Sequence, residues 1–408
     1  MPSTSVTPES IGCIKADYAD TAITRGLATG QLTRRDVSLL KEYLAERRAT
    51  AGIGITRCNK ITFTLLSWRR FLPPFDELDI AAVYSGIEAL RSANSQRGRP
   101  FKQNTIADHV IILKGFLFWM VENEYLDIPE KKIQRIKSPQ RDTMTKRAGD
   151  LLTPHEIQDL IRACKWSRDR ALLMTLYEGG FRVGEIVQLT WGDLKSDQKG
   201  IAVNVKFKTS IPRYIRLIMA KEYLAEWRAD YLGDVQSESP VFLNEQRRPL
   251  TRAGVAAQIS RIAKRAQITK KITPHLFRHT RITHLLQEGV PESTVKLMMW
   301  GSLSTDMIST YGHLTGRDID AEIGRLYGLE EEKNGKDRAR LEPRVCPSCN
   351  LINPPGEDYC RGCMEALSPA AFAEEDAFRR YIIKHPVALR KYLDNIDQDS
   401  HNPADKKV

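Results

Sequence analysis

Two motifs far apart in the sequence carry side chains suited to phosphate chemistry. Arg182 follows the double glycine of GGFRVGEI, where the backbone can turn sharply and a partner can come close. His275 and Arg278 of TPHLFRHT are three residues apart at the expected start of a helix, so both project from one face. Because guanidinium groups match the oxygens of a phosphate, these residues predict a cationic phosphate pocket.

Two further motifs could complete that chemistry. Lys208 of KFKTSIPR lies at the tip of an expected hairpin, from which it can reach a bound ligand, and Lys206 is the alternative. Tyr311 of STYGHL is either a ring packed on the core or a nucleophile activated by a base or by nearby positive charge. No Asp/Glu cluster suited to Mg²⁺ accompanies the motifs, so Arg, His and Lys would have to stabilise the transition state. The set predicts metal-free phosphodiester transfer through a phosphotyrosine.

These four motifs, in this order and with the hairpin between the two arginines, resemble those of the tyrosine recombinases, the phage-integrase family. That family combines an arginine in a G-x-R-x-x-E setting, a hairpin lysine, an H-x-x-R motif, a further His or Trp and a late nucleophilic tyrosine. The resemblance covers residues 150–327 closely and the first half of the chain more loosely. It implies a site-specific DNA recombinase that cuts and rejoins DNA through a covalent 3′-phosphotyrosine without a catalytic metal.

The resemblance implies one nucleophile and a set of cationic partners. Tyr311 attacks the scissile phosphate and becomes linked to the 3′ phosphate of DNA, and Lys208 protonates the leaving 5′ oxygen. Arg182 and Arg278 hold the non-bridging oxygens. His275 assists the two arginines or the proton transfer.

Four more residues belong to the resemblance with lesser or open roles. Glu185 buttresses Arg182, and His313 follows the nucleophile as a supporting residue. Most family members have a Leu-Gly-His stretch before the tyrosine, but here the triplet is WGS, with Trp300 and Ser302 as candidates for that position. Neither side chain can carry a proton charge as His does. This departure leaves open a DNA-binding protein of the same fold that lacks the chemistry. A second alternative is a relaxing enzyme like the type IB topoisomerases, which uses similar residues but acts as a monomer.

The cysteines divide into two groups. Three are isolated among helical patterns, at Cys13, Cys58 and Cys164, and four form paired C-x-x-C motifs, at Cys346, Cys349, Cys360 and Cys363. Two such pairs around a Gly- and Pro-containing loop predict four thiolate ligands for a structural zinc ion, with two disulfides as the less suitable alternative for a cytosolic chain. A zinc ribbon behind the tyrosine resembles archaeal members of the family. Its segment is not basic, which favours a protein partner over nucleic acid.

The charge distribution favours a polyanionic partner. The chain has 62 Lys and Arg against 51 Asp and Glu, a net charge of +11. Residues 1–150 carry 23 basic and 17 acidic side chains, residues 151–330 carry 26 and 20, and residues 331–408 carry 13 and 14. Two basic segments followed by a neutral one fit duplex DNA held between two domains, because bound phosphates release counterions. The family further implies a tetramer on DNA.

Periodicity places these motifs on a mainly α fold with a small β-sheet, an α+β protein. The expected parts are a tail at 1–29, a helical core-binding domain at 30–138, a basic linker at 139–150, a catalytic domain at 151–330, a four-cysteine zinc ribbon at 343–367 and a helical C-terminal tail at 368–408. Thr33 and Thr153 begin capping boxes, and IAVNVKFKTSIPRYIRLI alternates as a hairpin does. The first residues lack a signal-peptide pattern and the longest apolar run is interrupted by Lys114, so we expect a cytoplasmic protein without a membrane segment.

Overall fold

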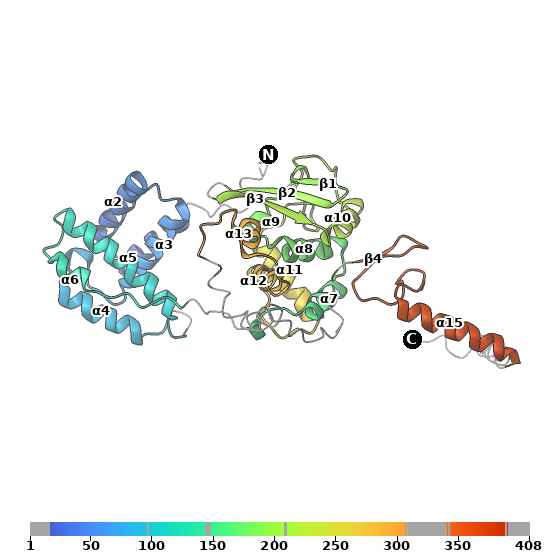
Figure 1. The fold of residues 1–408 in the computed structure, drawn as a ribbon. Helices are drawn as coiled ribbons and strands as arrows, with labels where there is room; N and C mark the ends of the chain where they lie inside the picture. Colours follow the sequence, from blue (N-terminus) through green and yellow to red (C-terminus); the bar gives the residue numbers. More distant parts are fainter. Residues whose placement is uncertain are drawn as a thin grey trace, which may run out of the picture. The chain divides into compact units, whose positions relative to one another are not determined.

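The structure, a computed structural model, describes residues 17–95, 98–142, 148–207, 210–306, 308, 341, 343–387 and 390. The chain forms two compact units: a helical unit within Cys13–Thr145 and a larger unit that contains Lys146–Val408 together with Met1–Gly12. Figure 1 draws the described part of the helical unit in blue to teal and that of the larger unit in green to red.

The helical unit contains no described strand. Its elements are α1 (Asp17–Ala28), α2 (Arg34–Ala51), α3 (Ile55–Trp68), the 3-10 turn η2 (Phe75–Glu77), α4 (Ile80–Ser92), α5 (Gln103–Glu122) and α6 (Glu130–Gln134). The predicted capping box at the start of α2 is confirmed, because the Thr33 side chain accepts from the backbone of Asp36 and the Asp36 side chain accepts from the backbone of Thr33. Such reciprocal bonds satisfy two N–H groups that a helix start otherwise leaves without a partner.

Two details of the helical unit correct the sequence expectation. The stretch 1–29, expected to be a tail, contains the helix α1, and Ile23 of that helix is buried in the core. Asn104 and Thr105 are residue types that suit a helix cap, but the helix α5 begins before them, at Gln103, and Lys102 at its start makes no side-chain cap. In both places burial of an apolar face outweighs local capping signals, since most helical stability in proteins comes from tertiary packing.

One described helix, α5, is long and apolar enough to cross a membrane by length and composition alone. Phe116, Leu117 and Met120 of this helix are fully buried among the aromatic rings of the helical core. Phe116 contacts Phe75 edge-on, with ring centroids 5.0 Å apart. The central helix of a helical core satisfies the same criteria of length and composition as a membrane-spanning helix, and the contacts of α5 are those of such a central helix.

The larger unit is helical around a small sheet and ends in two short strands and a helix. Its elements are η3 (Ala148–Asp150), α7 (Pro154–Arg162), α8 (Ser167–Gly179), α9 (Val183–Ile186), η4 (Trp191–Asp193), β1 (Leu194–Asp197), β2 (Gly200–Phe207), β3 (Ser210–Leu217), α10 (Ala220–Ala229), α11 (Arg252–Arg265), α12 (Pro274–Gln287), α13 (Glu292–Trp300), β4 (Arg344–Val345), β5 (Ile352–Asn353) and α15 (Pro369–Lys384). The mainly α fold with a small sheet, predicted from periodicity, is confirmed.

The predicted hairpin forms two of the three strands of the larger sheet. The strand order is β1-β2-β3 with antiparallel neighbours, and Val203 of β2 pairs with Ile215 of β3. The register shifts between Val205 and Phe207, so the ladder is irregular just before the tip. Irregularity at that point fits a hairpin end that positions a side chain and does not only extend the sheet.

The helix α8 is the centre of the larger unit. Of its residues, only Arg170 is not buried, and α10 and α12 both pack against it. Glu178, buried in this helix, accepts hydrogen bonds from the backbone N–H groups of Ile218, Met219 and Ala220 at the start of α10. Burial outweighs these bonds and raises the pKa of Glu178. The C-terminal end of α8 is thereby tied to the sheet and to α10.

Candidate functional site

The site begins where α8 ends. Gly180 has φ +53° and caps the helix in the left-handed conformation, as the double glycine predicts. A Cβ atom at this position would lie 2.6 Å from the Met299 sulfur, so no other residue fits without displacement. The chain then turns through Phe181, whose side chain is fully buried, and Arg182 becomes the N-cap of α9.

A buried carboxylate holds Arg182 in place. The backbone N–H of Arg182 donates to Glu185 Oε2 at 2.8 Å, and its guanidinium donates to Glu185 Oε1 at 2.9 Å. The Glu185 side chain is 2% exposed and that of Arg182 is 41% exposed, so the arginine reaches from a buried anchor to the surface. Burial raises the pKa of Glu185, but Arg213 and Arg182 outweigh burial and lower it. Glu185 therefore stays ionised and orients the arginine.

Arg213 on β3 is the second partner of Glu185, and the sequence analysis did not select it. Its side chain is 2% exposed and forms an ion pair with Glu185 Oε2. One nitrogen, Nη1, also donates to the carbonyls of Met298 at 2.8 Å and Gly179 at 3.4 Å. Burial lowers the pKa of Arg213, although Glu185 opposes that shift. The residue joins the sheet, the end of α8 and the end of α13.

Arg278 makes a matching connection from α12. It is 2% exposed, its Nη1 donates to the Gly180 carbonyl at 2.7 Å, and its Nη2 donates to the Met299 carbonyl at 2.6 Å. The guanidinium carbon lies 5.2 Å from the centre of the Trp300 ring, within the range of a cation–π contact. These contacts fix the plane of the guanidinium beside the turn that carries Arg182.

The remaining candidates lie around Arg278. His275 is exposed one turn earlier on α12, and its ring contacts His279 edge-on with centroids 4.3 Å apart. Trp300 is the last residue of α13, and Ser302 follows the cap at Gly301. The Ser302 hydroxyl lies 2.8 Å from that of Ser304. Of the two candidates for the open position, Trp300 is therefore the one that contacts an arginine of the site.

Several predicted residues cannot be placed. Tyr311, Lys208 and His313 lie outside the described residues, and Lys206 is described only in its backbone. The described neighbours on the chain are Ser210 at the start of β3 and Asp306 after α13. The structure thus brings together Arg182, Glu185, Arg278 and Trp300 and leaves the assigned nucleophile a prediction.

One signal in the sequence could have found Arg213. In the β3 segment SIPRYIRL, the inward-facing positions alternate, and Ile215 and Leu217 of that series are fully buried. Arg213 occupies the same parity, so a charge stands where the pattern requires an apolar side chain. A charged residue on the core side of a strand needs a buried counterion, and Glu185 is that counterion.

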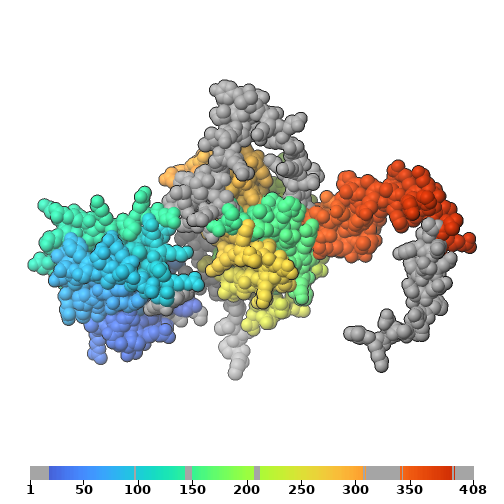
Figure 2. Space-filling view, turned by 90° about the horizontal axis from the view of Figure 1, so that it is seen from below, coloured from blue at the N-terminus to red at the C-terminus, as the bar shows by residue number. Residues whose placement is uncertain are grey.

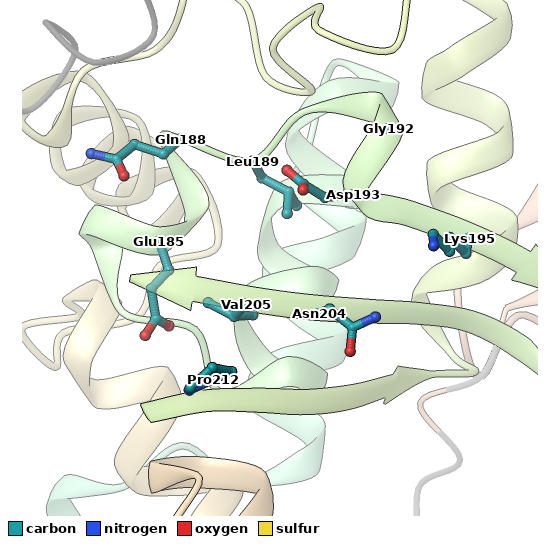
Figure 3. A pocket seen from close by; sticks show the side chains of 9 residues that line it. All are labelled: Glu185, Gln188, Leu189, Gly192, Asp193, Lys195, Asn204, Val205 and Pro212. Atoms are coloured by element: carbon teal, nitrogen blue, oxygen red, sulfur yellow. The ribbon is translucent and has the colours of Figure 1, made fainter. Parts of the chain in front are cut away.

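A hollow of about 370 Å³ lies beside this network, on the face of the sheet next to α9. Figure 3 shows Glu185 reaching from α9 towards β2 and β3, with Asn204 and Pro212 on the strands below it. The lining also includes Asp193 and Lys195, so the hollow carries both signs of charge. It is not a phosphate pocket by itself, because an anion site needs a net positive field.

The helical unit has a more basic hollow of its own, of about 760 Å³. Its cations are Arg25, Lys60 and Arg70, and Phe63 and Tyr18 stand beside them with 48% and 54% of their surface exposed. Basic side chains interleaved with exposed aromatic rings are typical of nucleic-acid surfaces, since cations meet phosphates and rings stack on bases or sugars.

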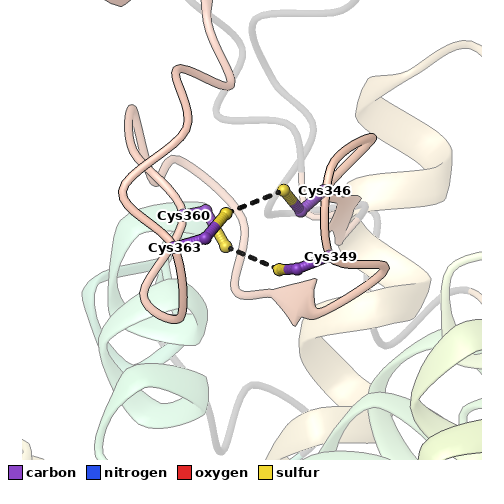
Figure 4. Close-up of side chains that lie close together, drawn as sticks. All are labelled: Cys346, Cys349, Cys360 and Cys363. Atoms are coloured by element: carbon purple, nitrogen blue, oxygen red, sulfur yellow. Dashed lines mark hydrogen bonds between the residues drawn. The ribbon is translucent and has the colours of Figure 1, made fainter.

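The four paired cysteines converge after the catalytic unit. Their sulfurs all lie within 4.8 Å of one another, with Cys346 and Cys363 3.5 Å apart and Cys349 and Cys360 also 3.5 Å apart (Figure 4). Zinc–sulfur bonds of about 2.3 Å in a tetrahedron separate the sulfurs by roughly 3.8 Å, so the donor set and its size fit one ion.

The surroundings of Cys360 also favour a thiolate ligand. Desolvation raises the pKa of Cys360, but the backbone N–H groups of Cys363 and Gly362 and the Asn353 amide lower it to about 6. The Asn353 amide nitrogen lies 3.5 Å from the Cys360 sulfur and the N–H of Gly362 3.4 Å from it. N–H donors around a thiolate are the second layer of contacts that structural metal sites use.

The cysteine module, defined as residues 343–367, docks on the catalytic core through α7. Arg162 Nε lies 3.2 Å from Glu357 Oε1, and its Nη2 donates to the Pro355 carbonyl at 3.4 Å. Ile352 of β5 packs against the core of the larger unit, which also includes Leu341. The module is thus a small appendage held by a few contacts.

Comparison with known proteins agrees with this arrangement. The model of the phage integrase family matches residues 150–317. Transposase A of transposon Tn554 from Staphylococcus aureus is 28% identical over 233 residues, 54% of this chain and 61% of the transposase. The tyrosine recombinase XerC of Bacillus pumilus is 30% identical over 222 residues, 51% of this chain and 70% of the recombinase. The chain thus spans about three fifths of the length of the Tn554 transposase.

Solved structures show the same fold. The lambda integrase fragment bound to DNA superposes with a TM-score of 0.54 at 17% identity, over 70% of this chain and 98% of that one. The integrase of transposon Tn1549, solved with transposon right end DNA, gives a TM-score of 0.52 at 18% identity, over 71% and 99%. The chain belongs to the phage integrase family, the tyrosine recombinases. The resemblance noted in the motifs is confirmed at the level of the family.

Proposed function

We propose that this protein is a site-specific DNA recombinase that cleaves and rejoins duplex DNA through a covalent 3′-phosphotyrosine at Tyr311. The observation that carries the proposal is the network around Gly180, where Arg278 donates to the Gly180 carbonyl two residues before Arg182 and Glu185 orients Arg182. Arg213, Arg182 and Arg278 bring three positive charges to this point, and Glu185 brings one negative charge. The excess positive charge suits a phosphodiester.

The reaction follows from these groups. The Tyr311 oxygen attacks phosphorus, the bond to the 5′ oxygen breaks, and Lys208 gives that oxygen a proton. Arg182 and Arg278 stabilise the charge that develops on the non-bridging oxygens, in a partly dry site where such contacts are strong. His275 takes up the tyrosine proton or shares in binding the phosphate. Reversal, with a 5′ hydroxyl of another strand as the attacking group, rejoins the DNA.

At the position where most family members carry a histidine this chain has Ser302, and the other candidate, two residues earlier, is Trp300. Its indole N–H can donate to a phosphate oxygen but cannot transfer a proton, so we assign it to binding and not to acid–base chemistry. Its ring under Arg278 supports this role, because the contact holds the guanidinium against the phosphate. Ser302, paired with Ser304, is not needed for the reaction.

The helical unit would close on the other side of the duplex. Its hollow with Arg25, Lys60 and Arg70 supplies phosphate contacts, and Tyr18 and Phe63 supply rings. Lambda integrase and the Tn1549 integrase have been solved on DNA, which supports the same partner here. Strand exchange joins paired sites, so we expect four chains on two sites. Because its substrate would be chromosomal or mobile DNA, we expect the protein to act in the cytoplasm.

The cysteine module would hold one structural zinc ion. Four sulfur donors leave no coordination position for water, so the ion stabilises the module and takes no part in DNA chemistry. Cys346, Cys349, Cys360 and Cys363 are the ligands, and Asn353 and the N–H of Gly362 orient Cys360. A protein partner for the module remains a proposal, supported by the neutral charge of the segment 331–408.

A covalent-capture experiment tests the proposal. Nicked duplexes with randomised sequence are incubated with the protein, and DNA that stays bound through denaturation is sequenced to give the target site. The native chain should then give a covalent protein–DNA band on that site. Tyr311→Phe should abolish the band, and the control Tyr214→Phe, at an exposed tyrosine of β3, should keep it.

Two outcomes contradict the proposal. If the native chain binds the selected DNA but forms no covalent band, the protein is a DNA-binding member of the fold without the chemistry. If Tyr311→Phe still forms the band, another residue is the nucleophile. Relaxation of a supercoiled plasmid without the selected site would instead favour the topoisomerase-like reaction.

A further inference from the structure

The basic hollow of the helical unit carries charge of one sign. The described residues that line it include Arg25, Lys60 and Arg70 but no Asp or Glu. The hollow beside Glu185, by contrast, is lined by charges of both signs. In Figure 2 the described residues of the helical unit are coloured from blue to teal. A volume of about 760 Å³ is that of a pocket for a small ligand, and the positive charge suits an anionic one.

Two of the three cations are held in place. Lys60 Nζ lies 2.6 Å from Asp108 Oδ2, and the other oxygen of Asp108 pairs with Arg141. Burial raises the pKa of Asp108, but Lys60 and Arg141 outweigh burial and lower it. Arg70 donates to the Asn94 carbonyl at 3.2 Å. The Lys60 side chain remains 44% exposed, so it is oriented and still accessible to a phosphate oxygen.

Aromatic rings stand beside these cations. Phe63 and Tyr18 are 48% and 54% exposed, and Phe101 also lines the hollow. A base inside a duplex is stacked on both faces, so its faces cannot meet these rings. A base that has left the stack offers its faces, and proteins hold such bases on aromatic side chains. The rings therefore favour an unpaired nucleotide over a paired one.

His109, which also lines the hollow, is a hydrogen-bond acceptor. Its Nδ1 lies 2.9 Å from the Thr105 carbonyl oxygen, which can only accept, so Nδ1 carries the proton. Burial lowers the pKa of His109 and outweighs the opposing effects of Thr105 and Asp108, so the ring is neutral and its Nε2 accepts. The rings of Phe101 and the fully buried Trp68 lie 5.5 and 6.1 Å from that of His109 and fix its position.

Gln31 adds a second acceptor to the lining. Its Nε2 donates to the Leu66 carbonyl at 2.8 Å, which leaves Oε1 to accept. Adenine, cytosine and guanine carry exocyclic amino groups that donate hydrogen bonds, whereas thymine carries none. Two neutral acceptors among cations and rings therefore favour a nucleotide whose base has an amino group.

We propose that this hollow binds one unpaired nucleotide of a DNA strand and selects a base with an exocyclic amino group. His109 Nε2 accepts from that group, Phe63 and Tyr18 stack on the base, and the cations bind the flanking phosphates. Three cations suit the two phosphates that flank a nucleotide in a strand, whereas a free nucleoside monophosphate brings one. The inference rests on the proposed function, because strand exchange separates paired strands before it rejoins them.

Fluorescence anisotropy with two labelled duplexes tests the site. One duplex is fully paired, and the other has the same sequence with one extra, unpaired adenine. All chains carry Tyr311→Phe, so no DNA is cut. The duplex with the unpaired adenine should bind about tenfold more tightly, which is the gain from stacking one base. Phe63→Ala should remove this preference, and the matched control Phe378→Ala, at an exposed phenylalanine of α15, should keep it.

Replacing the unpaired adenine by unsubstituted purine tests the acceptor. Purine keeps the ring system but lacks the amino group, so the affinity should fall about fivefold, as for the loss of one hydrogen bond. In His109→Phe, which keeps an aromatic ring beside Phe101 and Trp68, adenine and purine should bind equally. The comparison of the two bases on the chain with His109 intact needs no substitution in the hollow, so it decides the question even if His109→Phe does not fold.

Three results would overturn the proposal. They are equal affinity for the paired and unpaired duplexes, equal affinity for adenine and purine, and a Phe63→Ala chain that keeps the preference. Deoxyadenosine monophosphate should compete only weakly, and competition at the same concentration as the unpaired duplex would overturn the assignment to a DNA strand. None of these measurements involves cleavage. A chain that forms the covalent Tyr311 band without preferring the unpaired adenine would keep the recombinase function and lose this inference.

Discussion

The arginine network and the cysteine module are held together in opposite ways. Arg213 and Glu185 are each 2% exposed, and they sit behind a large apolar core that includes α8 and the sheet. The buried residues of the cysteine module are Cys346, Asn353, Pro354, Pro355, Cys360 and Ala366, and apolar side chains such as Met364 are exposed, at 66%. The geometry of the arginine network therefore depends on buried charge pairs within a large core, whereas the module has only a small buried set around its four cysteines.

Metal removal should give the largest effect. Structural zinc contributes on the order of 10 kcal/mol to small modules at neutral pH, and the module has too small a core to fold without it. Chelation, or Cys346→Ser, should therefore abolish the hydrogen-exchange protection of residues 344–366 while α8 stays protected. Metal analysis should find one zinc ion per chain in the native protein and none in the variant.

The control for that prediction is Cys58→Ser, which changes an isolated cysteine in the helical unit. It should leave both the zinc content and the exchange pattern unchanged. If metal removal instead lowers the protection of α8 as much as that of the module, the two regions fold as one unit and are not stabilised independently.

Breaking the buried ion pair should give the next largest effect. Arg213→Ala leaves Glu185 buried without its main counterion, so the free energy of unfolding of the larger unit should fall by about 3–5 kcal/mol. Arg216 lies on the same strand but pairs with Asp197 at the surface, where solvent screens the pair, so Arg216→Ala should lower the free energy of unfolding far less. Urea unfolding of both variants measures their losses of unfolding free energy. Similar losses would mean that the buried pair of Arg213 and Glu185 does not stabilise the larger unit.

The turn at Gly180 should tolerate a side chain poorly. Gly180→Ala combines a positive φ with a contact to Met299 and should cost about 2–4 kcal/mol. Gly52 also has a positive φ, at +58°, but no atom lies within 4 Å of its added Cβ. Gly52→Ala should therefore cost only about 1 kcal/mol. Thermal unfolding of the two variants checks whether the close contact with Met299, and not the positive φ alone, requires a glycine at position 180.

A half-buried histidine, His284, should make the larger unit acid-sensitive. Burial and the nearby Arg281 lower the pKa of His284 to about 4, and its Nδ1 lies 2.9 Å from the Tyr177 hydroxyl. The unfolded chain binds this proton near pH 6.5, so the stability contribution is complete above about 6.5 and is lost as the pH falls towards 4.

The measurement is a pair of pH profiles of unfolding free energy, for the native chain and for His284→Gln. The difference in unfolding free energy between the two proteins should shrink by on the order of 2 kcal/mol as the pH falls from about 6.5 towards 4. This figure already allows for the partial exposure of the His284 ring. Parallel profiles would show that His284 titrates alike in the folded and unfolded chain.

The sequence predicted local features of both the larger unit and the cysteine module. The capping box at Thr153, the end of α8 at Gly180 and the β2–β3 hairpin were all readable, because each rests on a local pattern. The four cysteines were readable from spacing alone, since each C-x-x-C pair brings two sulfurs together. Local rules therefore predict the ends of elements and the metal-ligand set.

What could not be predicted depends on contacts distant in the sequence. Arg213 contacts Met298 because α13 packs on β3. No residue near Arg213 in the sequence indicates that Glu185 is its counterion. The helix α1 was missed because its apolar face becomes meaningful only when Ile23 packs into the helical core. The aromatic residues Phe378 and Tyr381 of α15 are visible in the sequence, but only the structure shows that they are exposed.

The most direct test of the central claim measures covalent complex formation on a nicked target duplex in the presence of EDTA, for the native chain and for Cys346→Ser. If the arginine network carries the chemistry and the cysteine module is a metal-dependent appendage, both proteins should form the Tyr311–DNA adduct at similar rates. Loss of the adduct on chelation, with DNA binding retained, would contradict metal-free cleavage and the division between the two regions.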